Sequence, residues 1–186
     1  MSALTPANQL TLLRMLLIPA LVILVVYGVN GWALVVFVVA GLTDALDGLL
    51  ARLWNQPTSL GALLDPMADK LLLISTFVVL TIPSLDLPNS LPVWLTVLVI
   101  SRDVIIVVTV AIVNLSVGRR IFTPTLLGKL ATLIYILTAS LTLYFNWLGR
   151  PSILVKVAGY AALGITLISG LHYIRHVTRV LSEPER

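Results

Sequence analysis

Residues 15–28 read MLLIPALVILVVYG, without a charged side chain, and a second apolar run begins at Gly31. No clear small-residue cleavage site follows the first run, so we interpret it as a retained membrane helix rather than a signal peptide. The whole chain agrees, because 59% of its 186 residues are hydrophobic, 11% are charged and the mean hydropathy is +1.05. Soluble domains are only roughly 45–50% apolar. This composition excludes a soluble fold.

The chain contains six apolar runs separated by turn residues: 15–28, 31–54, 63–82, 91–114, 125–147 and 152–173. Because a helix needs about 20 apolar residues to cross a bilayer, six crossings use most of the chain. We therefore expect an all-α, polytopic membrane protein with six transmembrane helices, forming a single domain over residues 1–186. A short amphipathic helix over residues 4–13 is expected to lie along the interface before the first span.

The distribution of Lys and Arg indicates the orientation. Six crossings put both termini on one side, whose span ends carry Arg14, Arg52, Lys70, Arg119, Arg120, Lys129, Arg175, Arg179 and Arg186. The other side has only Arg150 and Lys156. Because cytoplasmic loops carry the excess, we expect both termini in the cytoplasm and the protein in the inner (cytoplasmic) membrane. The net charge of +4 favours contact with anionic lipid over nucleic acid, and the absence of cysteine excludes disulfides and thiolate metal sites.

Half of the eight acidic residues lie in one short segment, at Asp44, Asp47, Asp65 and Asp69. Asp44 and Asp47 are three residues apart and Asp65 and Asp69 four apart, so each pair shares one face of its helix. A carboxylate at the centre of a membrane span costs about 2.5–3.5 kcal/mol, which makes simple solvation at a cytoplasmic turn a weaker explanation than a binding site. We expect the two pairs to converge.

Four converging carboxylates repel one another unless cations neutralise them. Oxygen ligands without Cys or His favour Mg²⁺, Mn²⁺ or Ca²⁺ over zinc or copper. Arg52 adds a partner for phosphate, and Gly48 and Gly61 remove side chains from the same helix faces, although helix packing explains each glycine equally well. The segment therefore predicts metal-assisted phosphoryl chemistry.

The segment Asp44-x2-Asp47-Gly48-x2-Ala51-Arg52-x8-Gly61-x3-Asp65-x3-Asp69 resembles the signature of the CDP-alcohol phosphatidyltransferase family at all eight fixed positions. Residues 8–14 (NQLTLLR) resemble the N-terminal motif of that family, and residues 64–70 (LDPMADK) resemble its glycerophosphate branch. The resemblance covers nearly the whole chain, and the six predicted helices fit it.

The resemblance implies a role for each matching residue. Asp44, Asp47 and Asp65 would bind two Mg²⁺ or Mn²⁺ ions that bridge the diphosphate of CDP-diacylglycerol, and Asp69 would complete the metal site and act as general base. The nucleotide pocket would be shaped by Gly48, Ala51, Arg52 and Gly61. The family also implies a homodimer. These roles agree with the chemistry, since two divalent ions can hold a diphosphate and stabilise the departing phosphate.

The resemblance leaves two acceptors open. Bacterial members mostly use sn-glycerol 3-phosphate, whereas the cardiolipin-synthase branch uses phosphatidylglycerol. Residues 100–106 (ISRDVII) are closer to the cardiolipin-synthase form, and residues 124–132 (PTLLGKLAT) resemble an element of both branches. Where the family often has Gln, this chain has Tyr135. We expect acceptor contacts from Arg102, Lys129, Arg119 and Arg120.

These basic residues also have structural interpretations. Arg102 and Asp103 can form an ion pair inside the membrane, and Lys129 and the arginine pair can serve orientation alone. His172 and His176 are interpreted as an interfacial stripe rather than a metal pair. Two other classes remain as alternatives: an intramembrane prenyltransferase, which the glycine and arginine positions disfavour, and a cation transporter, for which inverted repeats are missing from the sequence.

Overall fold

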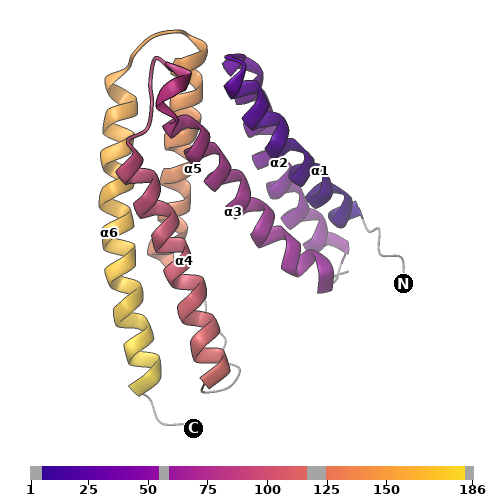
Figure 1. Ribbon diagram of the computed structural model, residues 1–186. Coiled ribbons are helices and arrows are strands. Elements are labelled where there is room, and N and C mark those ends of the chain that lie inside the picture. The colour runs from indigo at the N-terminus through magenta and orange to yellow at the C-terminus, as the bar shows by residue number, and fades with distance from the viewer. Residues whose placement is uncertain (1–5, 55–58, 117–124, 183–186) are drawn as a thin grey trace. The chain divides into compact units, whose positions relative to one another are not determined.

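The computed structural model describes residues 6–54, 59–116 and 125–182, and throughout these ranges the regular structure is helical. Its elements are α1 (Pro6–Val26), α2 (Asn30–Trp54), α3 (Ser59–Thr81), the 3-10 helix η1 (Pro83–Leu85), α4 (Val93–Ser116), α5 (Leu126–Trp147) and α6 (Ile153–Ser182) (Figure 1). The described side chains exclude residues 1–8, 44–66, 114, 116–124, 174 and 176–186. The all-α prediction is confirmed over this part of the chain.

Glycine and proline set several helix ends close to the predicted ones. The turn after α1 contains Gly28 at a φ of +74°, and the turn after α5 contains Gly149 at +65°. Glycine adopts these left-handed conformations without the steric cost that a Cβ atom would add. Pro92 directly precedes α4, where its missing N–H costs no helical hydrogen bond.

Two helices are longer than predicted. A separate interfacial helix was expected over residues 4–13, but residues 6–13 are the first turns of α1, which continues without a break through Val26. Arg14 interrupts the apolar run there but does not interrupt the helix, since arginine is a good helix former. At the other end of the chain, α6 passes the expected end at Tyr173 and reaches Ser182, because its last turns contain neither glycine nor proline.

Among the described residues, four helices are long and apolar enough to cross a membrane by length and composition. In the described part of the chain these windows are Gln9–Val26, Val93–Val113, Leu126–Trp147 and Ile153–Tyr173. A shorter apolar stretch occupies Asn30–Thr43 of α2. The chain is thus a polytopic membrane protein, and the crossing of the bilayer by α2 and α3 stays a prediction.

The chain folds into two compact units, each with its own internal packing. The first consists of residues 1–91 and 139–152, and the second of residues 92–138 and 153–186. In the first unit α1 packs against both α2 and α3, and α2 packs against α3. Its buried side chains include Leu21, Phe37, Phe77 and Leu80. The single domain expected over residues 1–186 stays a prediction.

Three turns of the first unit lie at one end of its helices (Figure 1). A methyl group added at Gly31 would lie 2.6 Å from Cδ1 of Trp147, so the indole packs where α2 lacks a side chain. The main-chain N–H of Asn89 donates to the side-chain oxygen of Asn146 at 2.8 Å, and its side-chain amide donates to the Arg150 carbonyl, also at 2.8 Å. The turns after α1, α3 and α5 therefore gather on the same side, as an up-and-down order of helices requires.

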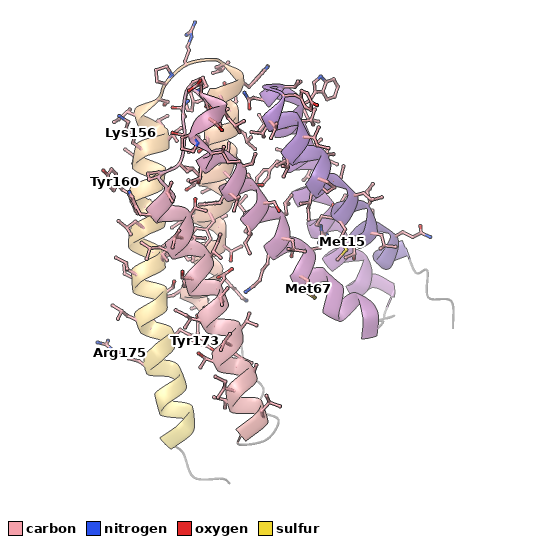
Figure 2. All side chains as sticks on the ribbon, viewed as in Figure 1. Met15, Met67, Lys156, Tyr160, Tyr173 and Arg175 are labelled. Atoms are coloured by element: carbon pink, nitrogen blue, oxygen red, sulfur yellow. The ribbon has the colours of Figure 1, made fainter. Side chains whose placement is uncertain are left out.

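In the second unit α4 and α6 run side by side (Figure 1). Tyr173 of α6 packs with Val113, Ile106 and Val110 of α4. Figure 2 shows Lys156, Tyr160 and Arg175 on the side of α6 turned away from α4, and all three are exposed.

Candidate active site

The four predicted metal ligands lie on α2 and α3, the two helices that pack against α1. Asp44 and Asp47 belong to the second half of α2, and Asp65 and Asp69 to the first half of α3. The helical spacing predicted for both pairs is confirmed by the backbone. The side chains of Asp44, Asp47 and Asp65 are outside the described part, as are those of Gly48, Ala51, Arg52 and Gly61. Their convergence on one site stays a prediction.

Asp69 is the member of the set whose side chain is described. Its Oδ1 accepts a hydrogen bond of 2.6 Å from a terminal guanidinium nitrogen of Arg14, on α1. The Arg14 side chain is fully buried, whereas that of Asp69 is 40% exposed. The buried guanidinium of Arg14 thus fixes the Asp69 carboxylate from the interior side, while part of the Asp69 side chain stays accessible. The sequence analysis used Arg14 as an orientation charge and as the last residue of the N-terminal motif, and it missed this contact.

The donor set fits a hard divalent cation. Carboxylate oxygens of aspartate are ligands that Mg²⁺ and Mn²⁺ prefer. Helices α2 and α3 each carry two aspartates, and the two on each helix are about one turn apart. Asp69 retains accessible surface beside its contact with Arg14. The accessible carboxylate of Asp69 can therefore bind a metal ion or accept a proton.

A second polar centre lies in the unit that contains α4. The guanidinium of Arg102 donates to Oδ1 of the adjacent Asp103 at 2.7 Å, and its side chain is 12% exposed. A Cβ atom added at Gly128 would lie 3.5 Å from the other terminal nitrogen of Arg102, so the guanidinium reaches the first turn of α5. The buried Nε of Arg102 has no hydrogen-bond partner among the described residues. The pair predicted from the sequence is therefore formed, with one N–H unsatisfied.

The first turn of α5 brings Lys129 next to this centre. Thr125 caps the helix, because its hydroxyl accepts the N–H of Gly128 at 3.1 Å. Lys129 follows directly and its side chain is exposed. Arg102 also lines a cavity of about 220 Å³ between α4 and α6, together with Ser101, Thr166 and Tyr173. The structure thus brings Arg102 close to the residue that precedes Lys129.

Four other residues were singled out in the sequence, and the side chains of three of them are outside the described part. Arg119 and Arg120, expected to contact the acceptor, fall outside the described residues, as does the side chain of His176. His172 is exposed on α6.

Comparison with known proteins identifies the family. The model of the CDP-alcohol phosphatidyltransferase family matches residues 4–169. The chain belongs to the CDP-alcohol phosphatidyltransferase family. A Streptomyces coelicolor protein named cardiolipin synthase (CMP-forming) is 38% identical over 159 residues, which cover 82% of this chain and 70% of that protein. A Mycobacterium tuberculosis protein named "Probable phosphatidylglycerophosphate synthase" is 34% identical over 183 residues, or 93% of this chain and 81% of that protein.

A human relative gives the same result for part of the chain. The human cardiolipin synthase (CMP-forming) is 43% identical over 126 residues, which cover 67% of this chain and 39% of the human protein. As a CDP-alcohol phosphatidyltransferase, this protein is a membrane enzyme of phospholipid biosynthesis that uses a CDP-alcohol donor. The family is generally dependent on divalent metal ions.

Tyr135 marks a departure of this phosphatidyltransferase from the family pattern, and the structure gives the side chain a partner on another helix. Its hydroxyl lies 2.7 Å from that of Thr166 on α6, and Tyr135 is buried. Thr166 itself donates to the Ala162 carbonyl at 2.6 Å, so Tyr135 is the donor of the shared hydrogen bond. The tyrosine thereby links α5 to α6.

Proposed function

We propose that the protein transfers the phosphatidyl group of CDP-diacylglycerol to a hydroxyl of sn-glycerol 3-phosphate and releases CMP. The acceptor oxygen forms a bond to the phosphorus that carries the diacylglycerol, and the bond from that phosphorus to the oxygen shared with CMP breaks. The proton of the hydroxyl passes to Asp69. The products are phosphatidylglycerol phosphate and CMP, and no covalent enzyme intermediate is needed.

Asp69 is the proposed general base because its carboxylate is anchored and accessible at once. The 2.6 Å contact with Arg14 fixes one oxygen, and 40% of the side chain remains exposed. A base must lie within hydrogen-bond reach of the proton that it removes, so a fixed position matters more than its resting pKa.

The donor is proposed to bind between α2 and α3. Asp44, Asp47, Asp65 and Asp69 would hold two ions, Mg²⁺ or Mn²⁺, and Gly48, Ala51, Arg52 and Gly61 would shape the nucleotide pocket. Bound divalent ions would neutralise the diphosphate and stabilise charge on the departing CMP. The chain's own contribution is to fix the carboxylates at helical spacing on two helices that both pack on α1.

The acceptor phosphate is proposed to contact four cations: Arg102, Lys129, Arg119 and Arg120. The observation that carries this assignment is the guanidinium of Arg102 against the first turn of α5, one residue before the exposed Lys129. The unsatisfied Nε of Arg102 also favours an oxygen ligand, because a buried N–H without a partner is costly. Two cations and a helix N-terminus suit a small dianion.

Phosphatidylglycerol is the second candidate acceptor, with cardiolipin as the product. It is favoured by the 38% identity to the protein named cardiolipin synthase and by the Ser101-Arg102-Asp103-Val104 sequence. The cavity beside Arg102, lined largely by apolar side chains of α4 and α6, also suits a lipid acceptor. We further propose a homodimer in the inner membrane, one domain per chain, with both termini and the active site facing the cytoplasm.

The test is CMP release from CDP-diacylglycerol by the purified protein in mixed micelles with Mg²⁺. Glycerol 3-phosphate, phosphatidylglycerol, inositol phosphate and serine are supplied separately as acceptors, and Asp44→Asn serves as the inactive control. Release with glycerol 3-phosphate alone supports the proposal, and release with phosphatidylglycerol alone transfers it to the second candidate. A folded protein that releases no CMP with any acceptor contradicts both.

A further inference from the structure

Arg14 is the largest fully buried side chain among the described residues, and its position is unusual for a charged group. A buried guanidinium loses its hydration, so it persists in a fold only where a counter-charge and hydrogen bonds compensate. A residue that served membrane orientation alone would keep its charge in water. The burial of Arg14 therefore calls for a role inside the protein.

The counter-charge is Asp69, 55 positions along the chain. The contact of 2.6 Å between a terminal nitrogen of Arg14 and Oδ1 of Asp69 is short, as charge-assisted hydrogen bonds are. It joins α1 to α3, two helices in direct contact. Thr11, one turn before Arg14, and Ala68, next to Asp69, are both fully buried. Both ends of the pair are thus set in packed surroundings that limit its movement.

The pair is asymmetric, which separates it from a simple structural ion pair. Arg14 has no exposed surface, whereas 40% of the Asp69 side chain is accessible. Arginine therefore approaches the carboxylate from the interior, and part of the Asp69 side chain stays accessible from outside. A carboxylate has about four lone-pair directions on two oxygens, and the hydrogen bond from Arg14 uses one of them.

We propose that Arg14 is a positioning residue for the transfer reaction: it holds the Asp69 carboxylate in the orientation from which it accepts the acceptor's proton. This inference rests on the proposed function of Asp69 as the base. Misplacing a reacting group by about 1 Å can cost about 10²-fold in rate, so loss of the guanidinium should appear mainly in kcat. The planar guanidinium is not reproduced by lysine, whose ammonium is a point charge on a flexible chain.

The experiment compares Arg14→Gln and Arg14→Lys with the wild-type protein and with Lys156→Gln, which removes an exposed cation from α6. The kcat and the KM for CDP-diacylglycerol are measured by CMP release, and thermal unfolding is measured in excess chelator. We expect Arg14→Gln to lower kcat by about 10²-fold and Arg14→Lys by about tenfold, with the donor KM unchanged in both. Lys156→Gln should match the wild type.

A double-mutant cycle with Asp69→Asn tests whether Arg14 acts through Asp69. In that background Arg14→Gln should lower the residual kcat by less than about twofold, because effects on one interacting unit are not additive. The cycle comprises the wild type, Arg14→Gln, Asp69→Asn and the double variant. In excess chelator, the changes in unfolding temperature caused by the two substitutions should also be non-additive, which detects the ion pair in the absence of metal and substrate.

Three results would overturn the inference. They are a wild-type kcat in a folded Arg14 variant, a loss confined to the donor KM, and an equal loss from Arg14→Gln with and without Asp69. If Arg14→Gln does not fold, Arg14→Lys decides by its kcat. Wild-type protein that releases no CMP would instead count against the proposed function, which keeps the two failures distinct.

Discussion

Asn89 and Asn146, 57 positions apart, bind each other through both main chain and side chain. The Asn146 oxygen accepts the main-chain N–H of Asn89 at 2.8 Å, and its amide donates to the Asn89 carbonyl at 3.0 Å. The Asn89 oxygen in turn accepts the N–H of Ser152 at 2.8 Å. Both asparagines are buried, so these bonds fix the turns after α3 and α5 against each other.

Asn146→Ala should therefore destabilise the protein without touching the site. It leaves the buried N–H and carbonyl of Asn89 without that partner, and each unsatisfied group costs about 1–3 kcal/mol. Thermal unfolding in detergent measures the loss, with Ser90→Ala as the control, since Ser90 is exposed in the same loop. An unfolding temperature equal to that of the control would contradict the structural role.

Another hydrogen bond of Asn89 adds to the prediction of membrane topology. Because Asn89 donates to the carbonyl of Arg150, the two turns must lie on one side of the membrane. Reporters inserted after Asp86 and after Arg150 should both be external, and a reporter fused at Arg186 should be cytoplasmic. Protease accessibility or cysteine labelling in intact cells measures this. Turns found on opposite sides would contradict the structure, whereas a uniformly inverted result would contradict only the charge argument.

Removal of divalent ions should abolish transfer. Four carboxylates on adjoining helices repel one another when they hold no cation, and the diphosphate adds further negative charge. Activity measured in excess chelator should be lost and should return with Mg²⁺ or Mn²⁺. Asp44→Asn, Asp47→Asn and Asp65→Asn should weaken the binding of Mn²⁺ and of the donor together. Full turnover in chelator would refute the proposed metal site.

Asp69→Asn should separate proton transfer from donor binding. The substitution removes the base, so turnover should fall by about 10²–10⁴-fold or more, while its neighbours still hold the donor. The asparagine oxygen can still accept the hydrogen bond from Arg14, which limits the structural damage. Equilibrium binding of CDP-diacylglycerol and single-turnover CMP release measure the two effects. Turnover within about twofold of the wild type would exclude Asp69 as the base.

The sequence predicted those features that depend on local chemistry. The helices end near Gly28 and Gly149 because left-handed turns favour glycine, and the acidic pairs share helix faces because their spacing is helical. The prediction of a separate helix over residues 4–13 is wrong, since hydropathy falls at Arg14 while helix propensity does not. A single charged residue within an apolar stretch thus ends neither the helix nor the candidate span, which begins at Gln9.

Contacts between helices could not be predicted in this way. The burial of Arg14 depends on the packing of α1 against α3, and nothing within residues 8–14 distinguishes a buried arginine from an interfacial one. Tyr135 departs visibly from the family pattern, but its bond to Thr166 requires knowing which face of α6 meets α5. In both cases the partner lies more than 30 positions away.

Lys129→Ala should distinguish between the two candidate acceptors. The lysine is exposed in the first turn of α5, next to the glycine that the Arg102 guanidinium approaches. A phosphate contact present in both the ground state and the transition state contributes uniform binding, so its loss should raise the acceptor KM more than it lowers kcat. Glycerol 3-phosphate should depend on such cations more than phosphatidylglycerol does, because phosphatidylglycerol is also anchored by its acyl chains. Steady-state kinetics with each acceptor therefore measure the difference, with Lys156→Ala as the matched control. A large rise in KM for glycerol 3-phosphate supports it as the substrate, and an unchanged KM for every acceptor removes Lys129 from the site.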